Sequence, residues 1–139
     1  MCYRVGLIVG FALAVSSGAW AQKPNFDGAW LEEGLPCADV FTSNGKTVSF
    51  KRPANLFVTA FIVRGQRLTT PAATCRIGRI DPKGDRQLLN LSCTTAIATE
   101  STTAILALTA DGGLQRYNVT DGTASAKYQR CMPGAPKTP

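Results

Sequence analysis

The sequence predicts an all-β fold: a single small antiparallel meander of about eight or nine strands, forming a barrel or a sandwich. Three observations predict it. Short segments rich in β-branched and aromatic residues recur at near-regular spacing, turn-forming residues separate them, and no stretch has a convincing amphipathic-helix period. Because the connections are short, strands that are neighbours in sequence are expected to pair.

Both ends of the chain are expected to lie outside the folded domain. Residues 1–21 have the pattern of a signal peptide: a basic residue, an apolar run and an A-x-A cleavage motif ending at Ala21. The apolar run is too short to span a membrane, which takes about 20 residues. Residues 133–139 are rich in proline and glycine and are expected to form a disordered tail. These boundaries leave a single β domain over 22–132, in the periplasm or secreted.

The first half of the domain contains four expected strands. Cys37–Phe41, between the first and second strands, is expected to be a helical turn or a short irregular segment. Asn44-Gly45 is a strong turn signal, and Pro53 interrupts the pattern because proline cannot donate to a strand ladder. The four strands are expected at residues 26–31, 47–51, 56–64 and 67–70.

The second half contains five expected strands and a central hairpin. Asp81–Asp85 is predicted to turn, because Pro82 fixes φ and Gly84 permits a positive φ. Gly78 falls where the apolar alternation changes phase, which predicts a bulge or a close backbone approach. Residues 94–103 are polar and small, and are expected to be a loop or an irregular strand edge. The five strands are expected at residues 74–80, 86–94, 104–109, 114–120 and 125–131.

An even number of cysteines in an exported chain predicts two disulfides in an oxidising compartment. The fifth cysteine leaves with the signal peptide. A four-thiolate zinc site is not expected, because the spacing is never C-x-x-C and the chain has no histidine. The four cysteines of the domain are Cys37, Cys75, Cys93 and Cys131.

Four cysteines allow three connectivities, and the sequence alone does not decide between them. Cys75 and Cys93 lie nine residues on either side of Gly84, so a symmetric hairpin would place them opposite each other. This geometry favours a Cys75–Cys93 disulfide, which leaves Cys37–Cys131 as the second.

Basic residues are concentrated in one part of the chain. Residues 46–86 hold nine basic and two acidic side chains, in a chain whose net charge is +6. Gathered on one rim, they would attract polyanions such as nucleic acid, lipid headgroups or acidic envelope polymers. The alternative is dispersed, solvated charge that keeps the domain soluble. The candidate surface for an anionic partner consists of Arg64, Arg67, Arg76, Arg79, Lys83 and Arg86.

No catalytic residue, cofactor or metal site is expected. The absence of histidine removes Ser–His and Cys–His catalysis, and no nucleotide-binding glycine motif is present. The aromatic residues do not interleave with the basic residues as a platform for single-stranded nucleic acid requires. A pair of carboxylates for acid–base chemistry remains possible, without a diagnostic motif. The candidates are Glu32, Glu33, Asp39 and Glu100.

The spacing of Trp30 and the four cysteines, closing on Tyr128-Gln129-Arg130-Cys131, resembles the uncharacterised small exported four-cysteine β proteins of bacteria. Gly28-Ala29-Trp30 is also similar to the Gly-x-Trp motif of lipocalin-like barrels, among them inhibitors of bacterial metalloproteases. That resemblance implies that Trp30 plugs one barrel end; the alternative is an ordinary buried tryptophan. The long gap between the first two cysteines of the domain departs from the close early pair of the inhibitor family.

Together these patterns predict an exported, non-enzymatic, disulfide-bonded β domain that acts as a binding or interaction module of the cell envelope. Its expected partner is an anionic envelope component or a protein. Two alternatives accompany this prediction. One is a carrier of a small apolar ligand, with a cavity beside Trp30. The other is a protease inhibitor whose N-terminal arm, Gln22–Phe26, enters a protease cleft.

Overall fold

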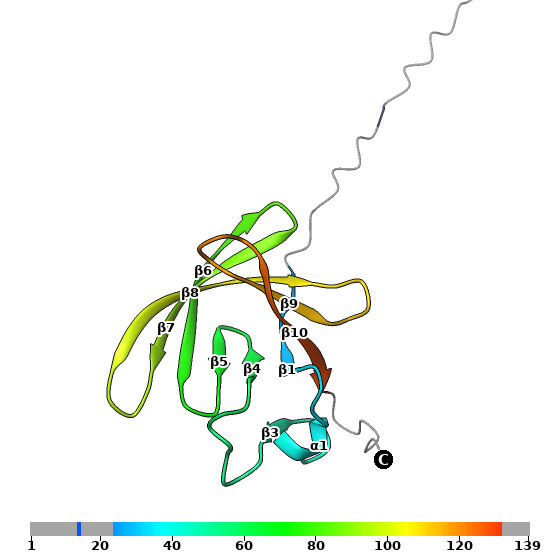
Figure 1. Ribbon diagram of the computed structural model, residues 1–139, viewed down its shortest axis with the longest axis vertical. Coiled ribbons are helices and arrows are strands. Elements are labelled where there is room, and N and C mark those ends of the chain that lie inside the picture. Colours follow the sequence, from blue (N-terminus) through cyan, green and yellow to red (C-terminus); the bar gives the residue numbers. More distant parts are fainter. Residues whose placement is uncertain (1–13, 15–23, 132–139) are drawn as a thin grey trace, which may run out of the picture.

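Eight antiparallel strands close into a barrel, which confirms the barrel form of the predicted meander (Figure 1). The computed structural model describes residue 14 and residues 24–131. The predicted tail at 133–139 and the predicted signal peptide at 1–21, apart from residue 14, lie outside the described residues. The strands follow the order β1-β10-β9-β8-β7-β6-β5-β4 around the barrel. They are β1 (Gly28–Glu32), β4 (Ala60–Arg64), β5 (Arg67–Thr69), β6 (Thr74–Lys83), β7 (Arg86–Thr94), β8 (Thr99–Leu108), β9 (Leu114–Tyr117) and β10 (Ala124–Cys131).

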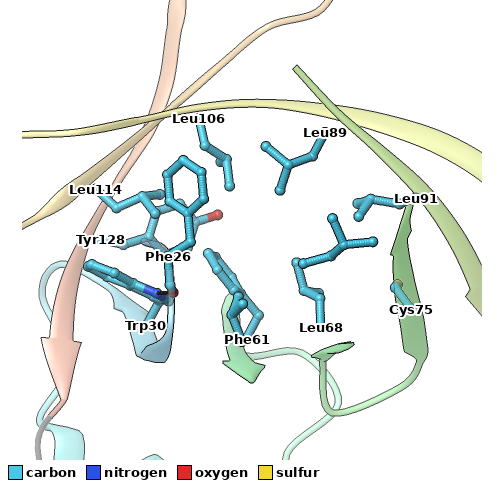
Figure 2. Packing of buried hydrophobic residues seen from close by; sticks show 12 residues of the cluster. Phe26, Trp30, Phe61, Leu68, Cys75, Leu89, Leu91, Leu106, Leu114 and Tyr128 are labelled. Atoms are coloured by element: carbon cyan, nitrogen blue, oxygen red, sulfur yellow. Dashed lines mark hydrogen bonds between the residues drawn. The ribbon is translucent and has the colours of Figure 1, made fainter. Parts of the chain in front are cut away.

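The interior of the barrel is packed with apolar side chains that alternate along the strands. Period-2 alternation sends every second side chain inward, so each strand contributes one or more core residues. Phe61 and Tyr128 meet edge to face, with ring centroids 5.1 Å apart (Figure 2). The interior cluster consists of Phe26, Trp30, Phe61, Val63, Leu68, Cys75, Ile77, Leu89, Leu91, Leu106, Leu114 and Tyr128.

A small insert between β1 and β4 covers part of the outside of the barrel. It contains a helical turn, α1 (Cys37–Val40), and an antiparallel pair, β2 (Phe41–Ser43) with β3 (Val48–Phe50). The helical turn was one of the predicted alternatives, whereas β2 was not predicted. Apolar side chains of the insert pack on the outward residues of the barrel. The buried members of this second cluster are Ala29, Leu31, Phe41, Ala60, Ile62 and Cys131.

Both predicted disulfides are confirmed. Cys75 and Cys93 are direct register partners on β6 and β7, and they are bridged. Cys37 is bridged to Cys131 across 94 positions of sequence, which ties the insert to the end of β10. One disulfide therefore locks a hairpin, and the other holds the insert against the barrel.

The central hairpin contains the predicted bulge at Gly78. Ile77 pairs with Leu91 and Ile80 pairs with Leu89, so two residues of β6 face one residue of β7. That one residue is Asn90, whose amide donates to the carbonyl oxygen of Arg79 at 3.0 Å. The turn itself is shorter than predicted, because β6 continues through Lys83.

Two predicted segments are wrong in the structure. The strand expected over 56–64 begins only at Ala60, because the side chain of Asn55 accepts a hydrogen bond from the Phe57 N–H and starts a turn. The loop or irregular strand edge expected over 94–103 is limited to the turn after Thr94, because β8 begins at Thr99 and pairs regularly with β7 from Thr99 to Leu106. Smaller differences are that β1 starts at 28 and β9 ends at 117.

Candidate anion-binding surface

Three of the predicted basic residues form a row across neighbouring strands. Arg64 on β4 is the direct register partner of Arg67 on β5, and Arg67 is the direct partner of Arg76 on β6. Direct partners in antiparallel strands share a face of the sheet. Their neighbours Val63, Leu68 and Ile77 fill the interior, so the three arginines lie on the outer face. We call Arg64, Arg67 and Arg76 the arginine row.

The row arises from a tight turn and a short strand. Gly65 has a φ of 57°, which suits the two-residue connection between Arg64 and Arg67. Its N–H donates to Oδ1 of Asp27 at 3.0 Å, which fixes the turn against the start of β1. The arginines at the ends of this turn thereby take adjacent positions on β4 and β5.

A groove of about 520 Å³ lies beside the row, between the insert and the outer face of β4 and β5. Arg52 joins Arg64 and Arg67 in lining it, together with the hydroxyl-bearing residues Ser49 and Thr69. The Arg64 guanidinium also donates to the carbonyl oxygen of Val48 on β3. We call this groove the arginine groove; it is lined by Ser49, Phe50, Arg52, Ile62, Arg64, Arg67 and Thr69.

Within the described residues, no carboxylate lies within 4.0 Å of the charged groups of Arg52 or of the arginine row. The carboxylates that form ion pairs do so with Arg79, Arg86 and Lys127. Arg52, Arg64 and Arg67 line the arginine groove, and Arg76 lines a neighbouring one. Their guanidinium groups, without a carboxylate in contact, can donate hydrogen bonds to the oxygens of carboxylates, phosphates and sulfates.

The other three predicted basic residues lie elsewhere and two are engaged. Arg79, at the bulge, pairs with Asp81 at 2.9 Å. The Arg86 guanidinium carbon lies 3.5 Å from the centroid of the Tyr117 ring, and Nη1 donates to the carbonyl oxygen of Gly122 at 2.7 Å. Lys83 ends β6 at the tip of the central hairpin. The structure therefore gathers Arg64, Arg67 and Arg76 but places these three apart from them.

Hydroxyl groups missed by the sequence reasoning extend the row. Arg76 is the direct partner of Ser92 on β7, and Ser92 is the direct partner of Ser101 on β8. These residues line a shallow groove of about 660 Å³, together with Asn90 and Thr103. Residues 99–103 are all polar, so the sequence carries no apolar alternation that would indicate a strand there.

Of the four candidate carboxylates, Glu33 takes part in an ion pair. Glu33 lies 3.5 Å from Nζ of Lys127, which also contacts Asp111 at 3.0 Å. Hydrogen bonds from the Thr109 hydroxyl, Lys127 and the Gly113 N–H hold the pKa of Asp111 well below its ordinary value. The same carboxylates raise the pKa of Lys127. In this exposed cluster, the hydrogen bonds to Asp111 favour the ionised form of its carboxylate.

Trp30 is fully buried in the barrel. Its indole N–H donates to the carbonyl oxygen of Phe26 at 2.8 Å, and the Arg130 guanidinium carbon lies 4.6 Å from its ring. Phe26 precedes β1 and its ring belongs to the same interior cluster (Figure 2). The prediction that Trp30 plugs one barrel end stays a prediction.

No protein-family model, curated protein or solved structure matches this chain. Among the described residues, no three side chains of His, Cys, Asp or Glu gather in a way that would hold a metal ion. The described part of the chain also contains no helix with the length and apolar character needed to cross a membrane.

Proposed function

We propose that this protein is an exported, non-enzymatic binding module of the cell envelope, and that its arginine row holds an anionic partner. The observation that carries the proposal is the direct pairing of Arg64 with Arg67 and of Arg67 with Arg76, without a described carboxylate in contact. The candidate partners are acidic envelope polymers and lipid headgroups, which carry many anionic groups in one molecule.

The chemistry of the row supports this proposal. Each guanidinium presents several N–H donors in a planar fork that matches two oxygens of a phosphate, sulfate or carboxylate. Like charges placed directly opposite on paired strands repel. A bound anion removes that repulsion, so the arrangement favours the bound state over the free one.

Export is supported by the two disulfides, which form and persist in oxidising compartments such as the periplasm and the extracellular space. The signal-peptide pattern at 1–21 points to the same route. The proposed location is therefore the periplasm or the exterior of the cell.

The packing of the barrel favours this surface function over the two alternatives. Twelve buried side chains occupy the interior, where a carrier needs space for its ligand. Phe26, which would belong to an inhibitory arm, is 4% exposed in the same cluster. An arm that includes Phe26 would have to leave the core before it entered a protease cleft.

The salt dependence of binding tests the proposal. Binding of the purified protein to polyphosphate and to neutral dextran is measured from low to physiological salt. The proposal predicts binding to polyphosphate alone, with log K falling against log salt at a slope of about −2 to −3, as expected for the release of a few counterions. Equal binding to dextran, or a response that is flat with salt, would contradict it.

A further inference from the structure

We propose that one end of the barrel docks on an anionic lipid surface, and that Phe57 and Ile97 insert among the lipid chains. This inference rests on the proposed function, because it names an anionic bilayer as the partner of the basic surface. Phe57 is 96% exposed and Ile97 is 94% exposed, values far above those of the other large apolar side chains in the described chain. Leu56, beside Phe57, is 61% exposed.

The turns that carry these side chains hold them away from the core. The Asn55 side chain accepts a hydrogen bond from the Phe57 N–H at 3.0 Å. The Thr95 hydroxyl accepts hydrogen bonds from the N–H groups of Ile97 and Ala98, both at 3.3 Å. Each turn is thus closed by its own polar side chain, and the apolar residue is left at the tip.

The two tips belong to loops at the same end of the barrel (Figure 1). Thr69 pairs with Thr74, and Thr74 pairs with Thr94, so the β5–β6 loop and the β7–β8 loop leave neighbouring strand ends. A shallow groove of about 300 Å³ joins this end to the β3–β4 loop, because Ala54 lines it together with Thr94 and residues 70–74. We call the loops at 51–59, 70–73 and 95–98 the docking end.

The charge of the docking end fits an anionic lipid surface. Its three loops contain two basic residues, Lys51 and Arg52, and no acidic residue. Arg52 also lines the arginine groove, which extends the positive surface from the docking end to the arginine row. Bilayers attract such surfaces when they carry anionic lipids, and apolar side chains then add hydrophobic binding.

The form of the apolar surface favours a bilayer over a protein partner. A stable protein interface buries about 800 Å² on each side around a contiguous apolar centre. Here the exposed apolar residues are separate loop tips among threonine, alanine and proline. Such tips fit between lipid headgroups, where each side chain reaches acyl chains independently of the other.

Vesicle binding tests the inference. Sedimentation with vesicles of mixed phosphatidylglycerol and phosphatidylcholine, or of phosphatidylcholine alone, is measured for the parent and for Phe57→Ser/Ile97→Ser. We expect the parent to bind only the anionic vesicles, and the double variant to bind them at least tenfold more weakly. Both proteins should bind soluble polyphosphate equally, because the arginine row is unchanged.

Val119→Ser is the matched control, because Val119 is an exposed aliphatic residue on another loop and is 51% exposed. Gly122 of that loop contacts Arg86 at the start of β7, whereas Ile97 follows the other end of β7. Strand rise of about 3.3 Å per residue puts these ends about 26 Å apart. This control variant should bind anionic vesicles like the parent.

The outcomes separate the two proposals. If Phe57→Ser/Ile97→Ser binds vesicles as the parent does, the proposal that the docking end binds lipid is wrong. The same follows if the parent binds polyphosphate but no vesicle. In both cases the proposal that the arginine row binds an anion is unaffected. Parent protein that binds neither would overturn both. A concentration-dependent dimer that the double variant abolishes would assign the tips to a second copy of the chain, and would also overturn the inference.

Discussion

Arg67 and Arg76 lie directly opposite each other on β5 and β6, with no described carboxylate within 4.0 Å of either guanidinium. Opposed residues in such pairs have Cβ atoms about 4.5–5.5 Å apart, and like charges there are destabilising. Arg64 adds a third charge beside Arg67. The repulsion within the row therefore destabilises the folded domain when no ligand is bound. We infer that these arginines serve to bind an anionic partner and not to stabilise the fold.

The first prediction concerns the stability of the free domain. Arg67→Gln/Arg76→Gln should leave Tm unchanged or raise it slightly at low ionic strength, because the substitution removes a repulsive pair. Thermal unfolding followed by circular dichroism measures this. A clear drop in Tm would show that these side chains stabilise the fold, and would remove the reason for assigning them to a partner.

The second prediction concerns the two disulfides. In the chain-entropy model, the 94-residue separation of Cys37–Cys131 is worth about 4.7 kcal/mol and the 18-residue separation of Cys75–Cys93 about 3 kcal/mol. Urea unfolding of the paired alanine variants should follow that order. A greater loss for Cys75→Ala/Cys93→Ala would mean that packing around Cys75, which is buried, outweighs chain entropy.

The third prediction tests the packed interior. Leu89 is fully buried at the centre of the cluster, so Leu89→Ala should lower the free energy of unfolding by about 2–5 kcal/mol. Val119→Ala, on an exposed loop, serves as the control and should change it little. A loss below about 1 kcal/mol for Leu89→Ala would indicate a loosely filled barrel, and would revive the carrier alternative.

The fourth prediction is a pH dependence at the exposed cluster. The pKa of Asp111 is lowered in the folded state, so its stabilising effect is present above the unfolded pKa, about 3.9, and is lost as pH falls toward the folded pKa. Asp111→Asn should therefore lower Tm slightly at pH 7, and the difference should shrink below about pH 4. A difference that stays constant into acid would contradict this assignment.

Local patterns in the sequence predicted most of the barrel strands and an irregularity at Gly78, and the symmetry of the central hairpin favoured, among three connectivities, the disulfide pairing that the structure has. Two segments of the structure differ from the prediction. Asn55 draws Leu56 and Phe57 into a turn, although their residue types favour a strand. The first half of β8 has no apolar alternation, because Glu100 and Thr102, the register partners of the core residues Cys93 and Leu91, are polar. In the first segment a hydrogen bond from the backbone overrides the hydrophobic signal, and in the second that signal is absent because the inward residues are polar.

The candidate surface depended on contacts between distant parts of the chain. The sequence placed six basic residues in one segment, but only register shows that Arg64, Arg67 and Arg76 are direct neighbours. Arg86 stacks on Tyr117, 31 positions along the chain, in a contact that no local spacing indicates. The sequence therefore does not distinguish Arg86, which packs on a neighbouring strand, from the arginines of the row.

The most direct test of the arginine row compares two variants that lose the same charge. Arg67→Gln/Arg76→Gln removes two bases from the row, and Arg79→Gln/Lys83→Gln removes two bases from the central hairpin. Affinity for polyphosphate is measured for both at one salt concentration. The row predicts at least a tenfold loss for the first variant and less than about a threefold loss for the second. Equal losses would contradict it, because net charge alone would then account for binding.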